Sequence, residues 1–243
     1  MGKISFNRQI FKIPRITRPR ISLKWLLLIV LILIIGGGGI WAYQNFSALP
    51  PEAAVLSAIE KTLNAESYRY HAISKKIVDN QEQLLSEVMG EKSNGNVHFI
   101  GKLHVVNSDF EIYQVNNKFY RKDVFSKDWL VLDQVNMEAT EKLIQEINPL
   151  GTFSLCEPLE VQYVGKEKIN GQKCRKYEVL AQNENKYLEV LWKDFSYVFW
   201  VNKDGLLAKA EINAVNKQHE NHSLIMSVEF SDYNEKIEIN API

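Results

Sequence analysis

The two cysteines are the residues of this chain best suited to form a covalent link. Cys156 and Cys174 are its only cysteines. In an oxidising compartment they would close a loop of about 19 residues, which stabilises a fold by roughly 3 kcal/mol through chain entropy. The sequence favours this disulfide, which would tie the loop after a predicted helix to a strand, and two free thiols are the alternative. Their spacing is not that of a redox motif or a zinc site.

His219 and His222, with Glu220 between them, come closest to a metal-binding pattern. They lie in a polar turn and no third ligand follows at a fixed spacing, so a solvated loop is the simpler interpretation. We expect no metal and no other cofactor. The sequence contains no glycine-rich phosphate loop and no serine in a nucleophile elbow. We therefore expect a protein that is not an enzyme.

Charge is divided unevenly along the chain, although 29 basic and 29 acidic residues give a formal net charge of zero. Residues 1–51 contain seven basic residues and no acidic one, so residues 52–243 carry a net charge of −7. Proteins that bind nucleic acids need a cationic surface to displace the counterions of the phosphates. An acidic body of this kind indicates that the partners do not include a nucleic acid.

One apolar segment separates the basic N-terminus from the body. Residues 25–46 contain no charged residue and would form a helix of about 33 Å, long enough to cross a bilayer. Trp25 and Trp41 suit its two interfaces, and the positive-inside rule predicts a cytoplasmic tail at 1–24 and an extracytoplasmic domain at 47–243. A cleaved signal peptide is the alternative, but the segment has neither a small-x-small cleavage site nor a lipobox cysteine. We expect an uncleaved signal anchor in the cell membrane with a single pass.

Alternation of apolar and polar residues dominates the body. Such alternation predicts an antiparallel sheet with one polar face. In the segment 97–105, for example, Phe99 and Leu103 share one face and His98 and Lys102 the other. The predicted strands cover 67–78, 82–92, 95–106, 108–115, 117–122, 128–132, 158–167, 172–181, 196–202, 206–215 and 221–231, with a short strand near 235–239.

Helical spacing of apolar residues predicts three helices in the body. The first begins at Pro50-Pro51, since proline suits a first helical turn. The second covers 136–147 and the third 185–195. In the third, the residues at helical spacing are Tyr187, Leu188, Leu191, Trp192 and Phe195. The simplest α+β packing places the helices against the concave face of a curved antiparallel sheet, and an apolar hollow between them would bind apolar ligands.

Several strand and turn motifs follow one another in a distinctive order. They are Ala58–Thr62, Ser67-Tyr68, Lys118–Tyr120 before Trp129, Ile169–Gly171 with Cys174 and Tyr177, Phe199–Leu206, Phe230–Asn234 and Ile239–Pro242. In this order the chain resembles the LolA/LolB/LppX superfamily of extracytoplasmic lipoprotein-handling and lipid-carrying proteins, especially its LppX/LprG-like branch. The resemblance implies an incomplete antiparallel β-barrel that covers helices, and a hydrophobic cavity for lipid or an acylated protein.

One apolar parity set from the strands and helices is expected to line that cavity. It comprises Phe99, Leu103, Phe110, Ile112, Phe119, Trp129, Leu143, Leu191, Phe199 and Met226. A filled core would use the same residues, because packed cores and cavity walls have the same composition. The expected function is binding of lipid or lipoprotein acyl chains by a membrane-anchored protein. The alternative is a non-catalytic sensor or scaffold that binds a membrane or wall protein at the cell envelope.

Overall fold

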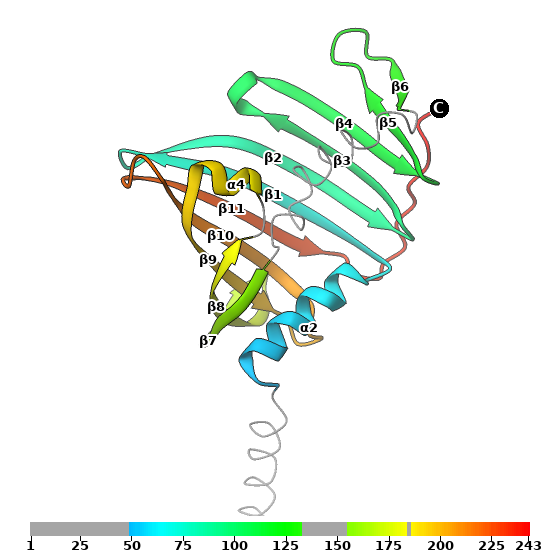
Figure 1. Ribbon diagram of the computed structural model, residues 1–243. Coiled ribbons are helices and arrows are strands. Elements are labelled where there is room, and N and C mark those ends of the chain that lie inside the picture. Colours follow the sequence, from blue (N-terminus) through cyan, green and yellow to red (C-terminus); the bar gives the residue numbers. More distant parts are fainter. Residues whose placement is uncertain (1–48, 133–154, 184–185) are drawn as a thin grey trace, which may run out of the picture. The chain divides into compact units, whose positions relative to one another are not determined.

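The computed structural model describes residues 49–132, 155–183 and 186–243 (Figure 1). The predicted basic tail (1–24), membrane segment (25–46) and second helix (136–147) lie outside these described residues. Within them, no helix is both long enough and apolar enough to cross a membrane. The body of the protein, Leu49–Ile243, forms one compact unit.

Eleven strands form one antiparallel sheet. Its order is β6-β5-β4-β3-β2-β1-β11-β10-β9-β8-β7, and β6 and β7 are its two edges, so the sheet curves without closing (Figure 1). This arrangement confirms the predicted curved, open antiparallel sheet. The strands are β1 (Ser67–Val78), β2 (Gln81–Ser93), β3 (Asn96–Leu103), β4 (Ser108–Val115), β5 (Lys118–Lys122), β6 (Trp129–Leu132), β7 (Leu155–Ile169), β8 (Gln172–Asn183), β9 (Trp192–Val201), β10 (Leu207–Asn216) and β11 (His222–Ser231).

Tight turns set the register between neighbouring strands. In the β1–β2 turn Asp79 and Asn80 have φ values of 50° and 65°. In the β2–β3 turn Asn94 and Gly95 have values of 50° and 83°. Two successive residues with positive φ match the right-handed twist of a hairpin, and Asn, Asp and Gly tolerate that conformation best. The turn residues therefore fix which side chains of adjacent strands share a face.

Helix α2 (Pro51–Leu63) packs its buried residues, among them Val55 and Ala58, into the main hydrophobic core. Near its C-terminus the buried Thr62 accepts a hydrogen bond from the Leu207 amide at 3.0 Å. Tyr233 donates its hydroxyl proton to the Leu207 carbonyl oxygen at 2.7 Å. The helix is therefore joined to β10 and to the C-terminal segment by polar contacts as well as by packing.

The third predicted helix is shorter than expected. Helix α4 covers Lys186–Leu191, and β9 begins at Trp192. Trp192 and Phe195 both lie in the main core although they are three residues apart in a strand. Asp194 between them has a φ of 54°, and the β9–β10 register shifts at this point. A bulge of this kind adds one residue and turns both aromatic side chains to the same face, which imitates helical spacing.

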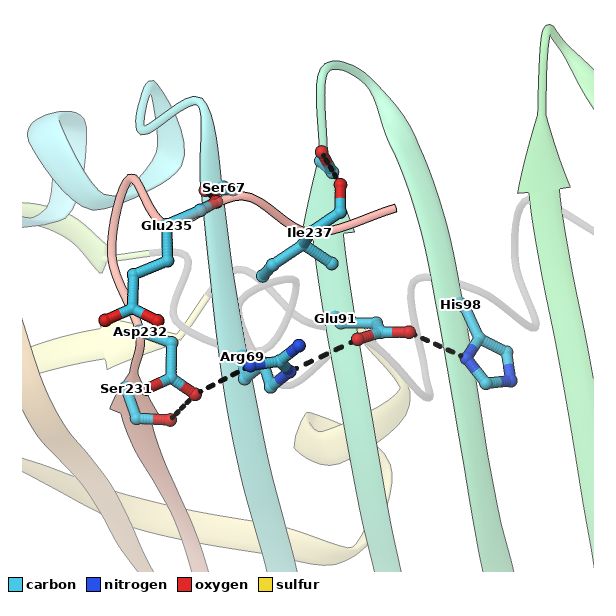
Figure 2. A network of polar contacts seen from close by, with 9 residues as sticks. Ser67, Arg69, Glu91, His98, Ser231, Asp232, Glu235 and Ile237 are labelled. Atoms are coloured by element: carbon cyan, nitrogen blue, oxygen red, sulfur yellow. Dashed lines mark hydrogen bonds and ion pairs between the residues drawn. The ribbon is translucent and has the colours of Figure 1, made fainter. Parts of the chain in front are cut away.

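The C-terminal segment also differs from the prediction, because residues 235–239 do not form a strand. Ser67 and Ser93 donate hydroxyl protons to the carbonyl oxygens of Glu235 (2.6 Å) and Ile237 (2.7 Å) (Figure 2). Ile237 and Ile239 pack beside Tyr120 in a second hydrophobic cluster. The apolar alternation is thus explained by an extended segment held by serine side chains and packing rather than by strand pairing.

Candidate ligand-binding face

The sheet has an inner face, which packs against α2, and an outer face. The register places a nearly continuous apolar row across nine strands of the inner face, from β7 to β4. In order, its members are Tyr163, Tyr177, Phe199, Ala210, Val228, Ala72, Val88, Gly101 and Phe110. Directly opposed residues of adjacent strands have Cβ atoms about 4.5–5.5 Å apart. The strands therefore present one uninterrupted apolar surface to whatever lies over the inner face.

Two glycines make part of this surface flat. Gly90 of β2 lies directly opposite Tyr70, and a Cβ at Gly90 would be 2.1 Å from the Tyr70 ring. Gly101 of β3 lies opposite Phe110, and a Cβ there would be 2.5 Å from the Phe110 ring. Each ring thus occupies the space that a side chain would fill at the glycine. Aromatic rings that lie across strand glycines keep the surface low and apolar at these points.

Burial varies along the inner face. Phe199, Ala210 and Val228 are completely buried, as expected of a packed core. Leu103 near the β3–β4 connection is 37% exposed, and Met226 of β11 is partly buried. Tyr163 on the edge strand β7 is 43% exposed, and Leu103 and Met226 lie toward the strand ends that carry the β1–β2 and β3–β4 connections. An apolar ligand would first meet the inner face at these ends.

Seven of the ten predicted cavity residues share the inner face, and whether they bind a ligand remains a prediction. They are Phe99, Leu103, Phe110, Ile112, Phe119, Phe199 and Met226. Leu143 lies outside the described residues. Leu191 ends α4 and is 54% exposed, so its side chain is not part of the buried apolar surface.

Trp129 was assigned to the wrong face. The register pairs Trp129 with Lys122 and Phe119 with Leu132, which turns Trp129 to the outer face and Phe119 to the inner one. The Trp129 ring contacts Tyr113 with ring centroids 5.3 Å apart, and Lys122 lies over its indole. All four residues of β6 are apolar, so the sequence of this strand has no alternation from which to choose a face.

The structure contradicts the predicted disulfide. Cys174 is a buried free thiol, and burial raises its pKa. In the β7–β8 register Glu167 faces Cys174, whereas Cys156 faces Gln182, eight positions farther along β8. Eight residues of strand span about 26 Å, and the Cα atoms of a disulfide are usually within about 7 Å. The two cysteines belong to the same strand pair but to its opposite ends.

A group of tyrosines forms one end of the inner face. Tyr68 packs edge-on against Phe230 at 5.7 Å and lies 5.9 Å from Tyr233, both measured between ring centroids. Burial raises the pKa of Tyr68 to about 12 and raises the pKa values of Tyr70 and Tyr233 well above the ordinary value. These phenols stay protonated at neutral pH and act as apolar side chains with one hydroxyl donor each.

The outer face carries a chain of charged side chains instead (Figure 2). Arg69 lies between Asp232 (3.1 Å) and Glu91 (3.3 Å). His98 then lies 3.2 Å from Glu91 and 3.3 Å from Glu111, and Lys122 lies 2.9 Å from Glu111. The contacts connect the end of β11 to β5 across the strands between them. Despite partial burial, Lys122 and His98 lower the pKa of the Glu111 carboxyl.

Two hollows lie on the outer face beside this chain of charges. They have volumes of about 500 and 450 Å³ and share Met89 and Ile100, which face each other across β2 and β3. Charged and polar side chains make up most of the rest of their lining. In the described part of the chain, no group of three His, Cys, Asp or Glu side chains could hold a metal ion. The two hollows thus place Met89 and Ile100 among charged and polar side chains, in contrast to the apolar row of the inner face.

Comparison with known proteins gives matches only at the level of structure. No family profile and no curated protein sequence matches the chain. The lipoprotein LppX of Mycobacterium tuberculosis has 16% identity, with a TM-score of 0.50 over 77% of this chain and 97% of LppX. LprF of Mycobacterium bovis has 12% identity and a TM-score of 0.48 over 79% and 98%. A LolA superfamily protein of Nitrosomonas europaea has 11% identity and a TM-score of 0.31 over 79% and 96%. As the order of its motifs predicted, the chain has an LppX-like fold.

Proposed function

We propose that this protein binds lipid or lipoprotein acyl chains on the inner face of its sheet. The observation that carries the proposal is the apolar row across nine strands, interrupted by no charged side chain from Tyr163 to Phe110. Acyl chains are long and flexible and need an extended apolar surface. Burying each methylene contributes about 0.8 kcal/mol, so acyl chains that pack on the accessible ends of the row, at Tyr163 and Phe110, would gain affinity from each methylene.

We also propose that the body lies outside the cell membrane and that the protein is not an enzyme. The uncharged segment 25–46 follows a tail with seven basic residues and no acidic one, which supports a single-pass anchor with the body outside the cell membrane. A non-catalytic role is consistent with an inner face made of apolar side chains and phenols that remain protonated at neutral pH. Protease added to intact spheroplasts should digest the body, and protection of the body would contradict this topology.

The test of acyl-chain binding uses two residues of equal exposure on opposite faces of β3. Leu103 on the inner face is 37% exposed, and Ile100 on the outer face is 38% exposed. The full chain, purified in an amphipathic polymer, is titrated with a fluorescent fatty acid and assayed for copurifying lipid by native mass spectrometry. Leu103→Trp should reduce binding of the probe several-fold, because the larger ring fills the accessible part of the inner face. Ile100→Trp is the matched control and should change nothing.

Unchanged binding in Leu103→Trp together with a lower melting temperature would mean that a filled core occupies this place. Failure of the wild-type chain to bind the probe or to retain lipid would reject the proposal as a whole. The second candidate function, docking of an envelope protein, is favoured by the exposed pair Met89 and Ile100 between the two outer hollows. In that case Ile100→Trp, rather than Leu103→Trp, should alter association with the partner.

A further inference from the structure

The inner face contains a small polar group within its apolar surface. The row next to the one described above runs through Tyr197, Ile212 and Met226 and then reaches Ser74 of β1 and Ser86 of β2. Leu103 follows Ser86 on β3. Two hydroxyl groups thus stand between two apolar side chains, Met226 and Leu103. In the row from Tyr163 to Phe110, by contrast, no serine or charged residue occurs.

Lys76 brings a positive charge to the same place. It follows Ser74 by two positions on β1, and the β1–β11 register continues without a shift, so both residues point to the inner face. Lys76 lies opposite Leu224, a buried member of the main core, and opposite Gln83 of β2. Lys76 itself is partly buried. The aliphatic part of a lysine can pack on such an apolar surface while its ammonium remains available to an anion or a hydrogen-bond acceptor.

No such partner is found among the described residues. Neither the Lys76 ammonium nor the hydroxyl groups of Ser74 and Ser86 form a side-chain hydrogen bond or an ion pair with them. The inner-face positions next to Lys76 on β1, β2 and β11 contain no carboxylate. The neighbouring Lys75 is different, since it points to the outer face and pairs with Glu82 at 2.8 Å. The two adjacent lysines therefore have the same charge but opposite surroundings.

We propose that Lys76, Ser74 and Ser86 bind the phosphate group of an anionic lipid whose acyl chains lie on the inner face. This inference rests on the proposed function and adds the class of headgroup to it. One ammonium and two hydroxyl groups supply hydrogen-bond donors to the unesterified oxygens of a phosphodiester. The opposed serines have Cβ atoms about 5 Å apart, and Lys76 follows at about 7 Å along the strand, within reach of its flexible side chain.

The position in the fold suits a headgroup. Lys76 is close to the β1–β2 turn at Asp79 and Asn80, at the end of the inner face where Leu103 remains exposed. The apolar row from Tyr163 to Phe110 lies on the other side of Ser74, toward the interior of the sheet. A bound lipid would thus keep its charge near solvent and extend its acyl chains over the apolar row. The converse orientation would bury the phosphate among carbon atoms at a large cost in desolvation.

The experiment compares two fluorescent lipids with identical acyl chains, a phosphatidylglycerol and a diacylglycerol, on the full chain in an amphipathic polymer. Lys76→Met should weaken binding of the phosphatidylglycerol about tenfold and leave the diacylglycerol unchanged. Lys76→Arg should restore most of the loss, because it keeps the charge. Lys75→Met is the matched control and should affect neither lipid. Ser74→Ala with Ser86→Ala should weaken phosphatidylglycerol binding by a smaller factor, and thermal unfolding of each variant verifies that it folds.

Equal effects of Lys76→Met on both lipids, or no effect on either, would overturn the headgroup site and leave acyl-chain binding intact. A wild-type chain that binds neither lipid would overturn the proposed function and this inference with it. Free inorganic phosphate could bind the same donors as a lipid headgroup, and a competition experiment distinguishes the two. At millimolar concentration inorganic phosphate should leave the phosphatidylglycerol bound. Displacement of phosphatidylglycerol but not diacylglycerol would assign the site to free phosphate and contradict a lipid headgroup.

Discussion

The two faces of the sheet are made by the same strands but are held together by different forces. On β3, Phe99 and Gly101 face inward and are covered by neighbouring side chains, whereas His98 and Lys102 face outward. The inner face carries an apolar row across nine strands, and the outer face carries a chain of ion pairs from Asp232 to Lys122. Hydrophobic burial scales with area and is not screened by salt, while exposed ion pairs contribute little and are screened. The inner face should therefore determine stability, and the outer face should tolerate change.

The largest difference between the faces should appear at two adjacent residues of β9. Phe199 is completely buried on the inner face, and Val198 lies on the outer face in a small cluster with Trp200. Phe199→Ala removes most of an aromatic side chain from a packed region and should lower the free energy of unfolding by about 3–5 kcal/mol. Val198→Ala should cost about 1 kcal/mol or less. Urea unfolding of both variants measures the difference.

Equal costs for these two variants would mean that the inner face around Phe199 is not tightly packed. A low cost for Phe199→Ala combined with stronger binding of a fatty-acid probe would indicate that the ligand fills the space left by the ring. A loss of stability in Phe199→Ala without any gain in binding is the result expected of a filled core at the centre of the sheet.

The dependence of stability on alkaline pH should differ between tyrosines of the inner face and tyrosines of the outer face. Burial raises the pKa of Tyr68 to about 12, compared with about 10 in an unfolded chain. Because the folded state keeps the proton longer, the stabilisation is complete below pH 10 and is lost as the pH rises from about 10 to 12. The whole effect is of the order of 3 kcal/mol. Tyr68→Phe should reduce the slope of stability against pH in this window.

Tyr113→Phe is the control for that measurement. Tyr113 lies on the outer face and is stacked on His98 at 3.9 Å, and partial burial together with Glu111 raises its pKa. Because Tyr113 remains partly exposed, water screens its ionised form and the slope should change less. If the two substitutions changed the slope equally, the inner tyrosines would be more accessible to water than their packing indicates.

Most of the sheet could be predicted from the sequence because its strands are long and regular. The alternation in β3, β4 and β11 assigned Phe99, Ile112 and Met226 to the correct face. Prediction failed where alternation is missing or interrupted. Every residue of β6 is apolar, so only pairing with β5 determines that Trp129 faces outward. In β9 the bulge at Asp194 gives two core aromatics the spacing of a helix.

The candidate headgroup site was missed for a related reason. Two of its residues, Ser74 and Lys76, lie on β1, and Ser86 lies on β2. Serine and lysine are usually exposed to solvent, so none of the three positions indicates a site when it is considered alone. Only the β1–β11 and β1–β2 registers bring them together on the inner face. The signal available in the sequence was the adjacent pair Lys75-Lys76, since two successive residues of a strand must point to opposite faces. One lysine of such a pair necessarily faces inward.

The flat part of the inner face can be tested at Gly90. A Cβ at this position would be 2.1 Å from the Tyr70 ring, so Gly90→Ala must displace the ring or the strand. Overpacking of this kind costs about 1–3 kcal/mol. The double variant Gly90→Ala with Tyr70→Ala should cost less than the sum of the single substitutions, because removal of the ring makes room for the methyl group. Additive costs would show that the ring does not occupy the space above Gly90.

The smallest effect is expected on the outer face. Glu91 accepts a hydrogen bond from the Arg69 Nε at 3.3 Å, and its other oxygen lies 3.2 Å from the His98 Nδ1. Glu91→Gln keeps the shape and removes the charge, so it should cost less than about 1 kcal/mol in dilute buffer. The cost should decrease in 1 M salt, where the screening length is about 3 Å.

Val88→Thr on the same strand supplies the inner-face counterpart to Glu91→Gln. Val88 is buried opposite Ala72, and the new hydroxyl would lie among carbon atoms. That change should cost about 1–3 kcal/mol, independent of salt, because desolvation of a neutral group does not depend on screening. A larger, salt-sensitive cost for Glu91→Gln than for Val88→Thr would reverse the assignment of stability to the inner face. Such a result would mean that the ion pairs between the end of β11 and β5 contribute more to stability than the apolar contacts of the inner face.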